Sequence, residues 1–135
     1  MANALYDKGR EGFLAGDIDW DAHVIKAILV DTADYTVNLS AHQFLSDIPG
    51  AARVAVSSAL TGKTASSGVA DADDLTFPGV SGDPAEALVL YQDTGVEATS
   101  RLIAYIDTAT GLPVTPNGGD ISVAWDNGAN KIFKL

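Results

Sequence analysis

The chain has 135 residues, of which 47% are hydrophobic and 19% charged, so it can form one domain but is short for a two-domain enzyme. Its 18 acidic and 8 basic residues give a net charge of −10. A surface this negative repels the phosphates of nucleic acid and of anionic membranes. The absence of cysteine excludes a disulfide framework, a thiolate zinc site and a cysteine nucleophile.

No targeting or membrane segment is expected. Residues 1–14 carry charged side chains between Asp7 and Glu11, where a signal peptide would have an apolar run. The apolar stretch 24–30 is interrupted by Lys26 and is far shorter than the roughly 20 residues of a membrane-spanning helix. We therefore expect a protein made in the cytoplasm, without a membrane partner.

The first segment predicts a short helix. Its apolar residues lie about two helical turns apart and can share one stripe, although two glycines interrupt the segment: Leu5, Tyr6, Phe13 and Leu14. Asn3 is a suitable N-cap, and Gly16 is suitable just after the helix end. We expect an N-terminal helical arm over residues 1–16 and a single β domain over residues 17–135.

A second helical turn is predicted at residues 40–43, where Ser40 and Gln43 have the spacing of a capping box. Pro49 and Gly50 should end it. The rest of the chain predicts strands, because short runs are rich in β-branched, leucine and aromatic residues: 23–30, 53–57, 74–77, 87–91, 101–106, 121–125 and 131–135.

These strands predict an all-β fold, an antiparallel sandwich or flattened barrel of about seven strands with a short N-terminal helix. Turn sequences such as 93–95 and Asn127-Gly128 favour hairpins, the second joining the last two strands. Strands 87–91 and 102–106 are apolar on both faces. Each needs cover on both sides, from a second sheet and from a helix, a loop or another subunit.

Charge is unevenly distributed along the chain. Residues 1–100 hold 5 basic and 15 acidic side chains, whereas residues 101–135 hold 3 of each. Like-with-like contact is least opposed in this neutral C-terminal third. Together with the two-faced strands, this predicts a homo-oligomer, with a trimer favoured.

One group of acids has the spacing of calcium ligands. Asp17, Asp19 and Asp21 match the first three ligand positions of a calcium loop. The same loop would need glycine at Ala22 and glutamate at Ile28, so a polar turn that exposes alternate acids is favoured. We predict no metal and no cofactor, with a weak calcium site at the three aspartates left open.

No catalytic motif is complete. The sequence Gly62-Lys63-Thr64 resembles the end of a phosphate-binding loop, but Ser57 occupies the position of the first glycine. The sequence 79–82 misses the nucleophile elbow because Asp83 replaces the last glycine. Two histidines share no short spacing with other ligand types: His23 and His42. We therefore predict that the protein is not an enzyme.

Three parts of the chain resemble a group of small virion structural proteins of tailed bacteriophages: 1–10, 25–47 and 102–135. The most distinctive parts are 106–113 and 126–133. The resemblance implies a non-enzymatic structural protein of the virion, a capsid decoration (cement) protein that docks on the lattice of the major capsid protein. A neck or tail component is the alternative, with other virion proteins as partners.

We expect docking through apolar residues of the N-terminal segment and the C-terminal third: Leu5, Tyr6, Phe13, Leu102, Ile106, Phe133 and Leu135. An alternative from another class is a carbohydrate-binding module, in which exposed aromatic side chains would stack on a sugar. The candidate aromatics are Trp20, Trp125, Tyr35, Tyr91 and Tyr105. A small hydrolase is a third and weaker alternative.

Overall fold

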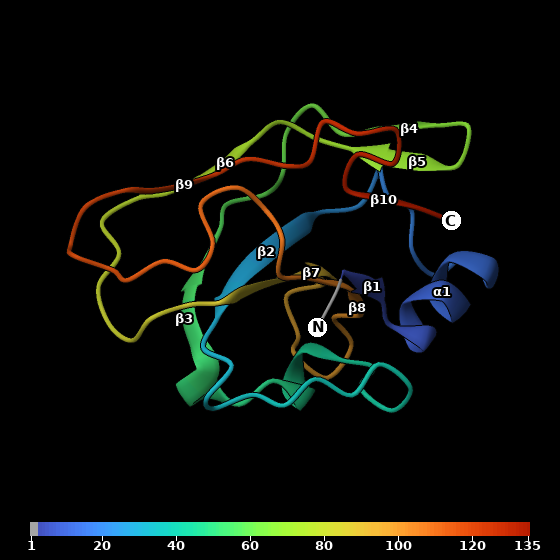
Figure 1. Cartoon of the computed structure of the whole chain (residues 1–135). Coiled ribbons are helices and arrows are strands. Elements are labelled where there is room, and N and C mark those ends of the chain that lie inside the picture. The colour runs from blue at the N-terminus through green and yellow to red at the C-terminus, as the bar shows by residue number, and fades with distance from the viewer. Residues whose placement is uncertain (1–2) are drawn as a thin grey trace.

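The structure, a computed structural model, describes residues 3–135 and is an all-β fold of antiparallel sheets with one short α-helix (Figure 1). The predicted fold class is therefore confirmed. A five-stranded sheet in the order β1-β8-β7-β2-β3 lies in the middle of the molecule. Its strands are β1 (Ala4–Leu5), β2 (Ile25–Val30), β3 (Arg53–Val56), β7 (Ala87–Gln92) and β8 (Leu102–Ile106).

Two smaller sheets lie over one face of the five-stranded sheet (Figure 1). The three-stranded sheet has the order β10-β5-β4, and the two-stranded sheet pairs β6 with β9. Their strands are β4 (Thr64–Ser66), β5 (Val69–Asp71), β6 (Leu75–Phe77), β9 (Ile121–Val123) and β10 (Phe133–Lys134). The layers form a sandwich with one continuous and one divided sheet.

All seven predicted strands are present, with ends that differ by one or two residues. Three further strands, β1, β4 and β5, were missed because each has only two or three residues, and those of β4 are all exposed. The β4–β5 turn is made by Ser67 and Gly68, both with positive φ (52° and 79°), as expected for a tight hairpin. The predicted hairpin between the last two strands is wrong, because β9 pairs with β6 and β10 with β5.

The sandwich core fills the space between the sheets. Successive side chains of a strand point to opposite faces, so Leu88 and Leu90 of β7 face this core, whereas Val89 and Tyr91 face the other side. Both tryptophans belong to the sandwich core. Its large residues include Ile18, Trp20, Ile25, Leu29, Leu75, Phe77, Leu88, Leu90, Ile103, Ile106, Ile121, Val123, Trp125 and Ile132.

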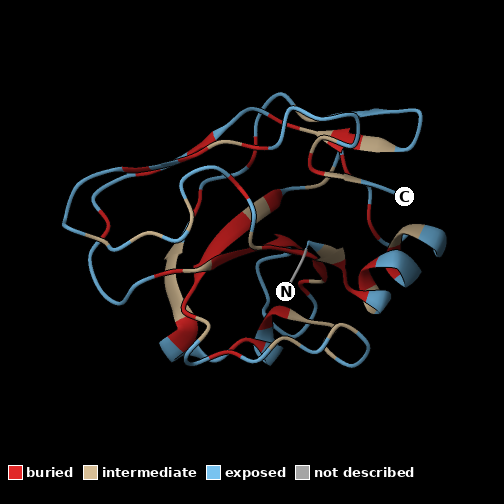
Figure 2. Ribbon diagram, in the orientation of Figure 1, coloured by how far each residue is buried: buried red, intermediate tan, exposed pale blue. Residues whose placement is uncertain are grey.

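The loop-side core lies on the opposite face, under segment 31–52. This segment contains the 3₁₀ helices η1 (Leu45–Asp47) and η2 (Gly50–Ala52). The core consists of Tyr6, Ile28, Val30, Tyr35, Leu45, Ile48, Ala52, Ala87, Val89, Tyr91, Leu102 and Tyr105. Strands β7 and β8 are buried along their whole length (Figure 2). The chain itself covers both faces, so these strands do not require a second subunit.

The N-terminal segment is built into the domain. Strand β1 pairs with β8, and α1 (Asp7–Leu14) packs against β8. The helix starts after Tyr6 and not at Asn3, whose side-chain amide instead binds Thr108 Oγ1 at 2.6 Å and the Asp107 N–H at 2.9 Å. Over its described residues, the predicted arm is thus an integral part of the fold.

The second predicted helical turn is displaced along the chain. Residues 40–43 form no helix, with 40 and 41 in a turn, and η1 begins two residues later at Leu45. The carboxylate that caps it is Asp47, which accepts the N–H groups of Gln43 at 2.7 Å and Phe44 at 3.0 Å. The predicted stop at Pro49 is followed at once by η2, since proline is compatible with the start of a helix.

Candidate interaction surface

Four of the predicted interface residues are buried inside the chain. Leu5, Tyr6, Leu102 and Ile106 are only 6%, 0%, 0% and 3% exposed. The prediction is therefore wrong for these four, because the side chains fill the two cores of the same chain. Of the covers that the sequence allows for a strand with two apolar faces, the structure has a second sheet and a loop segment, so β7 and β8 are the centre of the fold.

The other three predicted residues come together at one end of the molecule, where α1 and β10 lie near each other (Figure 1). The rings of Phe13 and Phe133 are 5.9 Å apart, and Trp20 meets Phe133 edge-on at 5.2 Å. We call Phe13, Leu14, Phe133 and Leu135 the terminal surface. Leu14 is 89% exposed and Leu135 58%, so the terminal surface presents apolar area to solvent.

The sequence of α1 explains why large apolar side chains remain outside. The helix turns Gly9 and Gly12 toward the domain, which brings its backbone close to β8 and leaves its bulky residues at the margin. A Cβ on Gly9 would lie 2.8 Å from the Leu102 carbonyl oxygen. Phe13 then packs against the sandwich core from its edge, while Leu14 points to solvent.

Two apolar hollows border the terminal surface. One, of about 320 Å³, lies between Phe13, Trp20, Phe133 and Leu135, and the other, of about 440 Å³, is lined by Leu14 and its neighbours. A third hollow of about 290 Å³ lies between β1 and β10 and is polar. Its charged residues are Arg10, Asp126, Lys131 and Lys134.

The acids with calcium-loop spacing form the predicted polar turn. Ile18 and Trp20 are buried, while Asp17, Asp19 and Asp21 are exposed. Asp17 forms an ion pair with Arg101 at 3.2 Å. Hydrogen bonds from Asp21 and from the Ala22 N–H lower the pKa of the Asp19 carboxyl. Within residues 3–135, these three carboxylates do not form a group whose oxygens lie within 4.8 Å of one another.

A different set of carboxylates could hold a cation. Among the described residues, Asp31, Asp34 and Asp83 each place one oxygen within 4.8 Å of the others. Asp31 is buried, and its Oδ1 accepts the Ala33 N–H at 2.9 Å. Sequence reasoning missed this group because Asp83 comes from a turn distant along the chain, and no spacing rule links it to Asp31.

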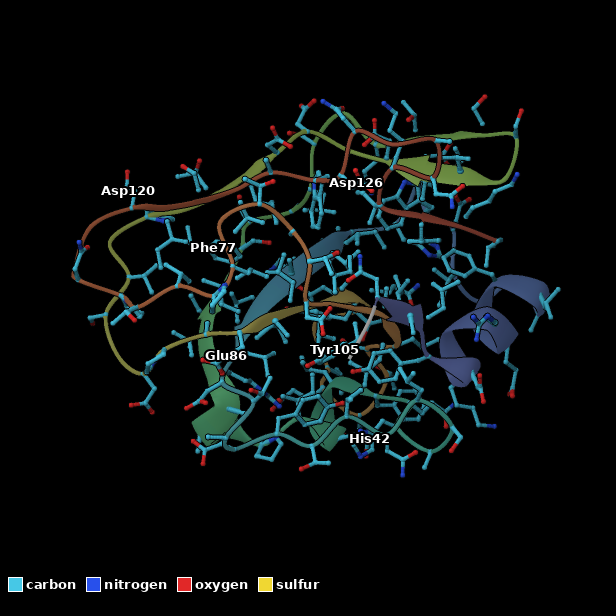
Figure 3. The ribbon with its side chains drawn as sticks, viewed as in Figure 1. His42, Phe77, Glu86, Tyr105, Asp120 and Asp126 are labelled. Carbon is cyan, nitrogen blue, oxygen red and sulfur yellow. The ribbon has the colours of Figure 1, made fainter. Side chains whose placement is uncertain are left out.

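His42 ends a hydrogen-bonded chain that satisfies buried hydroxyls. The Asn38 N–H points to His42 Nδ1 at 3.3 Å, which makes this nitrogen an acceptor. The Tyr35 hydroxyl donates to the same nitrogen at 2.8 Å and accepts from the Tyr6 hydroxyl at 2.8 Å. Burial raises the pKa of Tyr35 to about 12 and that of Tyr6 further. Figure 3 shows His42 on the Tyr105 side of the sheet.

His23 is also bound into the structure. Its Nδ1 accepts the Asp19 N–H at 2.9 Å and contacts the Gln92 amide nitrogen at 2.7 Å. Its carbonyl oxygen accepts a hydrogen bond from the Lys63 ammonium, whose pKa is lowered by burial. The lysine of the Gly62-Lys63-Thr64 sequence thus ties a loop to the start of β2, as a structural residue.

The aromatics considered for a sugar site are buried. Trp20 and Trp125 are 5% and 7% exposed, and Tyr35, Tyr91 and Tyr105 are 3% to 5% exposed. The indole N–H groups are used internally, donating to the carbonyls of Asp71 at 3.2 Å and Asp73 at 2.9 Å. These five rings therefore provide no stacking platform, and the carbohydrate-binding interpretation loses the residues on which it was based.

No family model matches the chain, and no curated protein matches it either. Within residues 3–135, no helix is long and apolar enough to cross a membrane.

Proposed function

We propose that the protein is a non-enzymatic structural component of a phage particle, a capsid decoration protein that docks as a folded β domain on the lattice of the major capsid protein. The observation that carries the proposal is the terminal surface. Its leucines, Leu14 and Leu135, remain exposed although the chain covers both faces of its central sheet. Exposed apolar area of this kind is typical of a surface that meets another protein.

Two other features support a binding role over a catalytic one. Both histidines have their Nδ1 engaged in hydrogen bonds within the chain, and Lys63 binds a backbone carbonyl. These groups stabilise loops and are poorly placed to take a proton from a substrate. The net charge of −10 keeps the protein away from packaged nucleic acid, as a protein on the outside of a capsid requires.

The experiment is to purify particles of the phage that encodes the chain and to locate the protein by mass spectrometry and cryo-EM. We expect density for the β domain on the outside of the capsid lattice, with the end that carries α1 and β10 against the capsid. Density confined to the neck or tail would replace this proposal with the tail-component alternative. Particles without the chain would overturn both.

A variant pair tests the docking face in the same particles. Leu14→Asp combined with Leu135→Asp places charge on the terminal surface and should abolish incorporation, with an unchanged melting temperature because both side chains are exposed. Val96→Asp is the matched control, since Val96 is 57% exposed on the loop between β7 and β8 and lines none of the hollows at the terminal surface. Equal incorporation of the two variants would contradict the assignment of the surface.

A further inference from the structure

We infer that the terminal surface and the polar hollow beside it form one binding site, for a partner segment that carries a carboxylate next to a large apolar side chain. The inference deepens the proposed function, because it states the chemistry of the segment through which a capsid protein would be bound. It rests on the contiguity of three hollows, on the distribution of charge and on the exposure of the two leucines.

The hollows are contiguous because they share walls. Arg10 and Lys134 line both the polar hollow and the 440 Å³ apolar hollow, which Leu14 and Leu135 also line. Phe133 borders the polar hollow and the 320 Å³ apolar hollow. A single extended segment can therefore place one side chain on apolar groups and a neighbouring one beside the cations.

The charge of the polar hollow is opposite to that of the whole protein. Five of the eight basic residues form ion pairs with the chain's own carboxylates: Lys8, Arg10, Lys26, Arg53 and Arg101. Lys131 and Lys134 form no ion pair with any residue between 3 and 135. Asp126 also lines the hollow, with its Oδ1 accepting the Gly128 N–H at 3.0 Å.

Two lysines and Arg10 thus surround one hollow in a protein with a net charge of −10. A carboxylate is attracted to this hollow and repelled by most of the remaining surface. The charge distribution therefore directs an acidic segment to bind at this hollow. The apolar hollows require that the bound segment also carry a large apolar side chain. Other exposed apolar residues, such as Val56 and Val96, line none of the three hollows.

The direct test is an NMR titration of the folded protein with octanoate, which joins a carboxylate to an alkyl chain. We expect amide shifts confined to residues that line the three hollows, strongest in α1 and residues 131–135. The response to octylammonium should be at least about tenfold weaker, because the lysines repel its charge. Octanoate binding should weaken as salt is raised. Equal binding of the two amphiphiles, or shifts scattered over the surface, would overturn the inference.

The matched variants are charge reversals. Lys131→Glu with Lys134→Glu should weaken octanoate binding about tenfold or more, and Lys131→Gln with Lys134→Gln serves if the first pair does not fold. Lys8→Glu is the control, because Lys8 lies on α1 but lines none of the three hollows. If Lys8→Glu weakens octanoate binding as much as the Lys131→Glu/Lys134→Glu variant does, the inference is overturned.

The same variants in particles separate this inference from the proposed function. Loss of incorporation for the Lys131/Lys134 pair, with Lys8→Glu incorporated normally, supports both. Normal incorporation of the Lys131→Glu/Lys134→Glu variant would overturn the inference, while the protein would remain a particle component. Selective octanoate binding by a protein that is absent from particles would overturn the proposed function and leave the site in place.

Discussion

The two cores on either side of the five-stranded sheet differ in chemistry. The sandwich core contains both tryptophans, and their indole N–H groups bond to backbone carbonyls at its edge. The loop-side core contains all four tyrosines, and two of them form a hydroxyl chain to His42. Figure 3 shows Phe77 and Tyr105 on the two sides of the sheet.

The difference follows from how each core is covered. A three-stranded sheet and a two-stranded sheet cover the sandwich core, and within each sheet the backbones of neighbouring strands satisfy one another's hydrogen bonds. Segment 31–52 covers the loop-side core with little regular structure, so side-chain hydroxyls, His42 and Asp47 bond it in place. A loop that covers a core therefore satisfies its backbone polar groups largely through polar side chains. Strands that cover a core satisfy theirs by pairing with one another.

Alkaline pH should have the largest effect, and it acts on the loop-side core. Burial raises the pKa of Tyr35 and Tyr91 to about 12, and it also raises those of Tyr6 and Tyr105. Unfolded tyrosine titrates near pH 10, so the unfolded state loses these protons first. Stability is complete below about pH 10 and falls as pH rises toward about 12.

We expect the protein to unfold in that range, followed by tyrosinate absorbance and by tryptophan fluorescence. The two signals should change together, because β7 and β8 contribute to both cores. Tyrosines that titrate near pH 10 while tryptophan emission stays constant would show that the loop-side core opens as a separate unit.

Leu90→Ala tests the sandwich core. Leu90 is fully buried in β7, and truncation of such a leucine costs about 2–5 kcal/mol of unfolding free energy. Urea denaturation should show this loss with both the tryptophan and the tyrosine signals. Val96→Ala, at an exposed site, should change stability by less than about 0.5 kcal/mol; similar losses in the two variants would contradict the assignment of the core.

Gly9→Ala tests how the N-terminal segment joins both cores. The added Cβ would lie 2.8 and 2.9 Å from the carbonyl oxygens of Leu102 and Ile103, which are backbone atoms that cannot turn away. We expect a loss of about 1–3 kcal/mol in urea denaturation. Gly50→Ala is the control, since its Cβ would meet nothing within 4 Å. If Gly9→Ala is as stable as Gly50→Ala, α1 does not pack tightly on β8.

Tyr35→Phe tests the polar chain under segment 31–52. It leaves the buried Tyr6 hydroxyl without its acceptor and should cost about 1–2 kcal/mol. Hydrogen exchange should rise mainly in residues 31–52. Tyr91→Phe should cost less, because the Tyr91 hydroxyl makes no hydrogen bond to a residue among 3–135. Equal costs would mean that burial of the ring, and not the hydroxyl chain, stabilises this core.

Asp93→Asn should have the smallest effect, because its contact lies at the end of the sheet and outside both cores. Lys26 and Asp93 form an ion pair of 2.7 Å, and the hydrogen bond from Lys26 lowers the pKa of Asp93. We expect a loss of less than about 1 kcal/mol at neutral pH. The difference from wild type should persist as pH falls through the ordinary aspartate pKa of about 3.9 and disappear only at the lower pH where the folded-state carboxylate is protonated. A difference that remains below that lower pH would contradict an ionic origin.

The sequence by itself determined seven of the ten strands of the described residues and the apolar character of both faces of the central strands. Alternation and β-branched composition predicted seven strands, and the runs 87–91 and 102–106 predicted cover on both sides. The alternation of Asp17, Asp19 and Asp21 with Ile18 and Trp20 likewise predicted an exposed polar turn. These features depend on residues that are close along the chain, and the periodicity of apolar and polar residues reflects them directly.

Only the tertiary structure decided which segments cover the central sheet. Apart from the helical turn predicted at residues 40–43, segment 31–52 has no strand or helix pattern, so nothing local in it shows that Tyr35 and Ile48 fill a core. Because the sequence does not show which segment covers β8, Leu102 and Ile106 were predicted at an interface, where they do not lie. Burial of a given apolar residue depends on contacts between residues distant in sequence, and these are set by the packing of the whole chain.

The terminal surface combines both kinds of information. The sequence indicated Phe13, Phe133 and Leu135 as candidate contact residues because they are large, apolar and near the ends of the chain. Their meeting at one end of the sandwich depends on the pairing of β10 with β5 and on the packing of α1 against β8. Strand pairing between positions more than sixty residues apart has no local signal, and for that reason the surface emerged only from the folded chain.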